Sequence, residues 1–369
     1  MRNNTKIMKK ITKKFVWICI FILLLCGCQK RRTTITFYGG TDVPLWILSA
    51  DYAFEQRDYE TALLYYQKIE KYYDTYNTGI DIEKAILFNS MGQCYYSFPD
   101  IENAILYFEK SSGLCEKIGD DELNFNNYWY LADLYNVKEP ENSMQALEYG
   151  RKAQESAERF YGKESSKVGK AYMCQGEVYM THMEFDKASE CFEKARKIVE
   201  KAEGKNSDSM AYLYFILGEF SNKKEEYEEA LAYYQEAEKI FEANENYFKL
   251  GQVYRDKGGV YTKTEEYEEA IATWDKCIEL YEKNNIIDTD LGYCHFGKAL
   301  VAAYLDKKDM AEEEFVKAHK IYESQSGKSK YADEMIDSIK EQLEFYYKKH
   351  YEEYKNGGFE IWYEKLITE

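Results

Sequence analysis

Seven alanines recur along this chain at a nearly constant spacing, and this repeat constrains the fold more than any other feature. The separations between them are 42, 42, 42, 42, 40 and 41 residues, and the alanines are Ala62, Ala104, Ala146, Ala188, Ala230, Ala270 and Ala311. Self-similarity at a fixed period indicates one supersecondary unit that is copied and stacked. The sequence therefore predicts a repeat protein.

Each alanine belongs to a wider pattern. A bulky ring follows it by four residues in six copies, as Tyr66, Phe108, Phe192, Tyr234, Trp274 and Phe315, and a small or apolar residue follows it by seven. Twelve residues before the alanine the chain has Ala50, Gly92, Gly176, Gly218, Gly258 or Ala299. Spacings of four and seven lie on one face of an α-helix. The pattern predicts two closely crossing helices per copy, which cannot bury their apolar faces alone and must stack.

The fourth copy carries the fullest version of the pattern, with Gly176, Tyr179, Ala188, Phe192 and Ala195. It resembles the tetratricopeptide repeat, in a long variant of about 42 residues similar to the repeats of kinesin light chains. The resemblance implies an all-α, right-handed superhelical solenoid of about seven helical hairpins over residues 43–330. Residues 331–369 break the pattern and are expected to form capping helices, because a solenoid needs a cover on its last hairpin. Amphipathic helices of an unrelated bundle are the alternative, but the constant phase disfavours it.

The start of the chain reads as an export signal. Residues 1–14 are basic and residues 15–27 are apolar, which is too short for a membrane-spanning helix of about 20 residues. The run ends in Leu25-Cys26-Gly27-Cys28, which resembles the bacterial lipobox. The resemblance implies removal of residues 1–27, lipidation of Cys28 and a flexible tether over residues 28–42. We expect a protein that is lipid-anchored on the extracytoplasmic face of the cell membrane. Ordinary secretion with cleavage nearby, and initiation at Met8, remain alternatives.

Composition argues against several functions. The chain has 49 basic and 66 acidic residues and a net charge of −17, which repels nucleic acid. Its four histidines are isolated, and its nine cysteines include no C-x-x-C pair or zinc-type spacing. We therefore expect no catalytic residues, no metal and no cofactor. Cys174 and Cys191 lie on opposite helices of one predicted hairpin, so a disulfide between them remains open.

The resemblance also implies where a ligand binds. Repeat positions are counted so that the small residue twelve places before the alanine is position 8. In this repeat family the first helices of the hairpins line a concave groove, chiefly through repeat positions 2, 5, 9 and 12. The candidate contact residues that follow are Trp129, Asp133, Met173, Glu177, Phe215, Glu219 and Tyr96. Aromatic anchors beside carboxylates suit a peptide with apolar and basic side chains. For any one ring, packing against a neighbouring repeat is an equal alternative.

Three functions are compatible with these observations. The first is a membrane-anchored scaffold that binds a protein or peptide in its groove. The second is a fixed subunit of an envelope assembly or secretion machine. The third is a lipoprotein that captures a solute or glycan for a transporter. The sequence favours the first and does not identify the partner.

Overall fold

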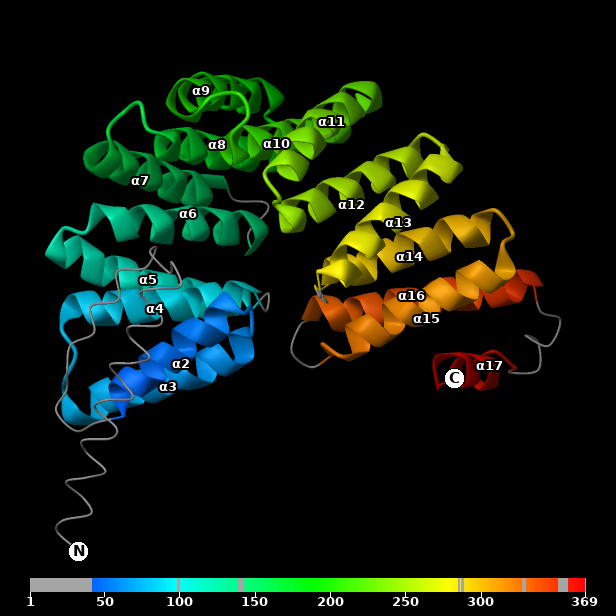
Figure 1. Cartoon of the computed structure of the whole chain (residues 1–369), viewed down its shortest axis with the longest axis horizontal. Helices are drawn as coiled ribbons and strands as arrows, with labels where there is room; N and C mark the ends of the chain where they lie inside the picture. The colour runs from blue at the N-terminus through cyan, green and yellow to red at the C-terminus, as the bar shows by residue number, and fades with distance from the viewer. Residues whose placement is uncertain are drawn as a thin grey trace, which may run out of the picture.

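The structure is a computed structural model that describes residues 42–97, 100–138, 143–284, 286, 289–326, 330–350 and 358–368. These residues form α-helices labelled α2 to α17 and no β-strand. Figure 1 shows that consecutive helices pair into hairpins, and that the hairpins stack into an arch with the first hairpin at one foot and the last helices at the other. The predicted all-α solenoid is confirmed. The predicted export signal and Cys28 lie outside the described residues.

Seven hairpins build the arch. Their bounds are α2 (Val43–Glu55) with α3 (Tyr59–Tyr76), α4 (Asp81–Ser97) with α5 (Ile101–Ile118), α6 (Asp121–Lys138) with α7 (Ser143–Tyr161), α8 (Ser166–Thr181) with α9 (Phe185–Glu203), α10 (Asp208–Lys223) with α11 (Tyr227–Ala243), α12 (Tyr247–Lys263) with α13 (Tyr267–Lys283), and α14 (Thr289–Tyr304) with α15 (Lys308–Glu323). Within each pair, the first helix ends in the polar turn that precedes the repeated alanine.

The repeat pattern describes the interior of each hairpin. All seven repeated alanines are 0% exposed, and the rings four residues later are also buried. A β-carbon on Gly176 would lie 2.4 Å from the ring of Phe192, and one on Gly258 would lie 2.4 Å from the ring of Trp274. The small residue is therefore required because the ring of the second helix covers it. The same ring reaches the next hairpin, as Phe192 does by packing edge-on against Phe220.

The third hairpin solves this packing differently. It has Gly150 where the other copies have a ring, and Gln175 of α8 fills the space, with its side-chain amide donating to the Gly150 carbonyl at 3.3 Å. A polar side chain from the following hairpin thus replaces the aromatic one. This departure leaves the stack continuous, because α7 packs against both α6 and α8.

The last two helices cover the end of the stack. Helices α16 (Lys330–His350) and α17 (Gly358–Thr368) both contact α15. Their buried side chains, Ile339, Leu343, Tyr347, Phe359 and Tyr363, share one core cluster with Ala311 and Phe315 of the seventh hairpin. Among the described helices, none combines the length and the apolar character needed to cross a membrane.

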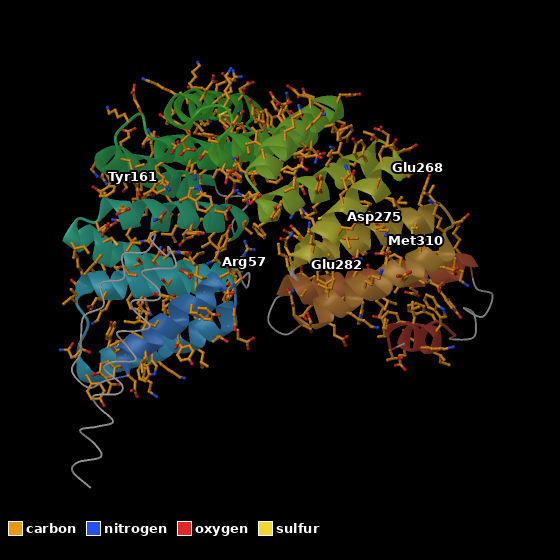
Figure 2. The ribbon with its side chains drawn as sticks, viewed as in Figure 1. Arg57, Tyr161, Glu268, Asp275, Glu282 and Met310 are labelled. Carbon is orange, nitrogen blue, oxygen red and sulfur yellow. The ribbon has the colours of Figure 1, made fainter. Side chains whose placement is uncertain are left out.

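The arch curves far enough to bring distant hairpins together. The Arg57 guanidinium, on the turn of the first hairpin, lies 4.1 Å from the centroid of the Phe248 ring at the start of α12. Figure 2 shows Arg57 on the inside of the arch, at the side of the first hairpin that faces α12. A cation over an aromatic ring contributes about 0.5–2 kcal/mol. This contact connects the first and sixth hairpins across the concave side.

Candidate binding face

The first helices of the hairpins form the inner side of the arch. Direct contacts join α6 to α8, α8 to α10, α10 to α12 and α12 to α14, so these helices lie together along the side with the tighter curvature. We call this side the inner face. Repeat position 9 comes directly after the small residue that is buried at the crossing of the two helices. The orientation of that buried residue also determines the side of the helix on which position 9 lies. Asp133, Glu177 and Glu219 occupy it on α6, α8 and α10, and all three are half-buried.

Asp133 has one neutral partner. The Tyr96 hydroxyl, from α4 of the preceding hairpin, donates to the Asp133 carboxylate at 2.8 Å. The Tyr96 ring is 36% exposed and packs edge-on against Tyr130 at 5.0 Å. Burial raises the pKa of Asp133, although the bond from Tyr96 opposes the rise. Burial and the neighbouring Asp133 charge raise the pKa of Tyr96 well above its ordinary value, so its hydroxyl stays a donor.

Glu177 and Glu219 are less well satisfied. Glu177 accepts one long bond, 3.5 Å from the Tyr212 hydroxyl, and burial together with the charges of Asp133 and Glu219 raises its pKa well above the ordinary value. In the described part of the chain, no hydrogen bond or ion pair reaches the Glu219 carboxylate. Burial and the nearby Asp256 charge raise the pKa of Glu219 to about 8. The charges of Asp133 and Glu219 disfavour ionisation of Glu177, and those of Asp256 and Asp133 disfavour ionisation of Glu219, because like charges in a poorly solvated site repel.

The cations near these acids do not balance them. Lys249 of α12 donates to Gln252 at 2.9 Å and places its ammonium 4.7 Å from the centroid of the Tyr212 ring, and burial lowers its pKa. Arg255 is engaged elsewhere, with ion pairs of 2.6 Å to Asp256 and 2.5 Å to Asp290. Among the described residues, Lys249 is therefore the cation that lowers the pKa of Asp133, Glu177 and Glu219 without being held in an ion pair of its own. The inner face therefore has more half-buried carboxyl groups than cations available to pair with them.

The structure separates the predicted contact residues into two groups. Tyr96, Asp133, Glu177 and Glu219 come together on the inner face. Met173 is 1% exposed and Phe215 is 6% exposed, and both belong to the central core cluster.

Phe215 packs its ring 6.0 Å from Tyr234 in its own hairpin, so it is structural rather than available to a ligand. Repeat position 5 is therefore a packing position in the fourth and fifth hairpins, because their first helices lie in direct contact. The prediction of Met173 and Phe215 as ligand contacts is corrected accordingly. Trp129, at position 5 of the third hairpin, is half-buried and packs edge-on against Tyr130 at 5.0 Å.

Two members of the inner face were missed by the sequence reasoning. Tyr212 occupies position 2 of the fifth repeat, which the resemblance names as a groove position, so it could have been found there. Lys249 lies nine residues before the small residue Gly258, in the added first turn of a long helix. The standard repeat has no position there to assign.

Comparison with known proteins supports the repeat assignment. Models of the tetratricopeptide repeat match residues 167–243 and 252–284, so the chain contains tetratricopeptide repeats. A search of curated protein sequences returned no match.

Solved structures share the fold at low sequence identity. A Rap protein in complex with Competence and Sporulation Factor is 14% identical, with a TM-score of 0.57, over 85% of this chain and 90% of its own. Yeast Tom70 is 16% identical, with a TM-score of 0.56, over 92% of this chain and 67% of its own. The apo form of RapI is 16% identical, with a TM-score of 0.54, over 77% of this chain and all of its own. These similarities show that the chain shares the helical-solenoid fold of these proteins.

Proposed function

We propose that this protein is a lipid-anchored, extracytoplasmic scaffold that captures a peptide segment of a partner protein on its inner face. The segment carries a cationic side chain, which binds among Asp133, Glu177 and Glu219. The observation that supports this most is the Glu219 carboxylate, which is half-buried, has a raised pKa and lacks a hydrogen-bond partner in the described structure. The lipid anchor rests on the sequence from Leu25 to Cys28.

Charge complementarity favours a cation. Burial raises the pKa of all three carboxyls, and the charges of neighbouring carboxylates raise those of Glu177 and Glu219 further, so a positive group placed beside them stabilises their ionised forms. A guanidinium or ammonium on a peptide supplies that charge with directional N–H donors, and charge-assisted bonds are about twice as strong as neutral ones. The half-buried Trp129 and the partly exposed Tyr96 both pack against Tyr130, and they offer apolar contact beside Asp133. A structural neighbour is solved with Competence and Sporulation Factor bound, which is consistent with ligand capture by this fold.

The experiment uses the detergent-solubilised full chain and a positional-scanning peptide array. We expect selection for Arg or Lys at one position and for an apolar residue near it. The triple variant Asp133→Asn, Glu177→Gln, Glu219→Gln should lose that selection and bind the selected peptide at least about 30-fold more weakly, because a buried charge pair is worth about 2–5 kcal/mol. Glu190→Gln, an exposed carboxylate on α9, is the matched control and should change little.

A second measurement identifies the acids directly. Because binding of a cation lowers the pKa of each raised carboxyl, peptide binding near pH 7 should release protons, and the binding enthalpy should depend on the ionisation enthalpy of the buffer. The triple variant should show no such dependence. If the folded triple variant binds the peptide unchanged, the inner face is not the site, and permanent docking through another surface becomes the leading function. Selection of a neutral glycan instead of any peptide would favour the solute-capturing alternative.

A further inference from the structure

Two cysteines from neighbouring hairpins meet inside the sixth and seventh repeats. Cys277 lies on α13 and Cys294 on α14, 17 positions apart in the sequence, and their Sγ atoms are 2.9 Å apart. Both side chains are 0% exposed. The S–S bond of a disulfide is about 2.05 Å long, so the sulfurs need to approach by less than about 1 Å. Both cysteines belong to regular helices, which hold this approach independently of any loop.

We propose that Cys277 and Cys294 form a disulfide that joins the sixth hairpin to the seventh. The reaction converts two thiols and one external disulfide into the Cys277–Cys294 bond and two reduced thiols. The oxidant is therefore a disulfide of a thiol–disulfide oxidoreductase or of glutathione. One thiolate of the protein attacks that disulfide, which releases one thiol and leaves a mixed disulfide. The second cysteine then attacks the protein sulfur of the mixed disulfide and releases the oxidant's other thiol.

The burial of the pair determines when the bond forms. Burial raises the pKa of Cys294 well above its ordinary value, and the adjacent Cys277 thiol raises it further. The thiolate that attacks a disulfide is therefore scarce in the folded protein, and the oxidant has no access to sulfurs with no exposed surface. The bond is expected to form while the sixth and seventh hairpins assemble, and to resist reduction afterwards.

The cross-link has a place in the architecture of the inner face. Cys294 lies one helical turn after Asp290, whose carboxylate binds Arg255 of α12 at 2.5 Å. Cys277 contacts the same helix, because its Sγ donates to the Gly251 carbonyl at 3.3 Å. A bond between the sulfurs fixes α14 against α13 beside this ion pair. It thereby holds in place the α12 end of the inner face. At this end Arg255 is ion-paired with Asp256 and Asp290, whereas Lys249 forms no ion pair in the described structure.

The test is oxidative refolding of the full chain. Protein that has been unfolded and reduced is refolded in detergent micelles with a mixture of reduced and oxidised glutathione, then unfolded in N-ethylmaleimide and mapped by mass spectrometry. We expect a cross-linked peptide that contains Cys277 and Cys294, with neither residue alkylated. The C-terminal thermal transition should rise by at least about 5 °C over the reduced protein, since closing a loop of this size constrains the unfolded chain.

Two variants make the result specific. Cys294→Ala should abolish both the cross-linked peptide and the dependence of the transition on oxidation. The double variant Cys174→Ala, Cys191→Ala should keep both, because it removes the other cysteine pair considered from the sequence and leaves Cys277 and Cys294 in place; all four are buried free thiols in the structure. Alkylation of both Cys277 and Cys294 in protein that refolded under oxidising conditions would overturn the proposal. So would cross-linking of either residue to a different cysteine.

Discussion

Replacing Glu219 by Gln should stabilise the free protein while it weakens binding. The pKa of Glu219 rises from 4.5 to about 8 on folding, because of burial first and the Asp256 charge second. For an acid with a raised pKa, folding is relatively favoured below pH 4.5, and that advantage is lost as the pH rises through 8. Each pH unit in this window costs about 1.4 kcal/mol, so at pH 7, where Glu219 ionises in the unfolded chain but stays mainly protonated in the folded protein, the folded state is destabilised by up to roughly 3 kcal/mol. This is an upper bound, because the side chain is only half-buried and interacts with other titrating groups.

The assay is urea unfolding at pH 5, 7 and 9, with hydrogen exchange in α10 as a local readout. The stability of Glu219→Gln relative to the native sequence should be near zero at pH 5 and should increase toward pH 9. Glu190→Gln is the control, because the salt bridge to Lys194 lowers the pKa of that exposed carboxyl and its removal brings no gain at high pH. A variant that is less stable than the native protein at pH 9, or a difference that is constant with pH, would refute the reasoning.

Three further predictions test the anchor, the repeat and the C-terminal core. Cys28→Ala should abolish uptake of an alkyne-labelled fatty acid and leave residues 1–27 attached, whereas Cys26→Ala should still be lipidated; native protein without label contradicts the anchor. Ala188→Glu buries a carboxylate at a fully buried helix crossing and should cost about 3 kcal/mol or more, measured by thermal unfolding, while Ala202→Glu on the exposed side of the same helix should cost under about 0.5 kcal/mol. Burial alone would raise the pKa of Glu314, but the bonds from His295 at 2.5 Å and Lys298 at 3.1 Å lower it to about 2, so its stabilisation is present above pH 4.5 and is lost as the pH falls toward 2. The difference in stability between native protein and Glu314→Gln should therefore shrink over that range, and a difference independent of pH would contradict it.

The fold was predictable because its determinants recur. Every repeated alanine, and the small residue under each ring, is fixed by a local steric requirement that recurs from copy to copy in the sequence. The filling of the third hairpin was not predictable. Only the structure shows that Gln175 enters from the next repeat to replace the missing ring beside Gly150. A pattern within one copy carries no information on which neighbour fills a gap.

The inner face was predictable only in part, for a related reason. Position 9 follows the buried crossing and reaches the inner face in the third to fifth copies, so the acids there could be found from the pattern. Position 5 depends on how closely successive first helices approach, and that distance buries Met173 and Phe215. Lys249 and Asp290 lie in the added first turn of α12 and α14, where the shorter standard repeat offers no equivalent position.

The repeat itself does not require acids at position 9, since the sixth and seventh copies have Gly259 and Leu300 there. In the first copy the acid has a structural use, because the Tyr66 hydroxyl of the same hairpin donates to Asp51 at 2.9 Å. The fourth copy has Phe192 at the position of Tyr66, so no hydroxyl of its own hairpin is available to Glu177. The third copy has Gly150 at that position, and in the fifth copy the Tyr234 hydroxyl makes no hydrogen bond to Glu219 in the described structure, so the ring of the hairpin satisfies none of these three carboxylates. Because such groups reduce the stability of the free protein, a function in binding positive charge is the simplest reason for their presence.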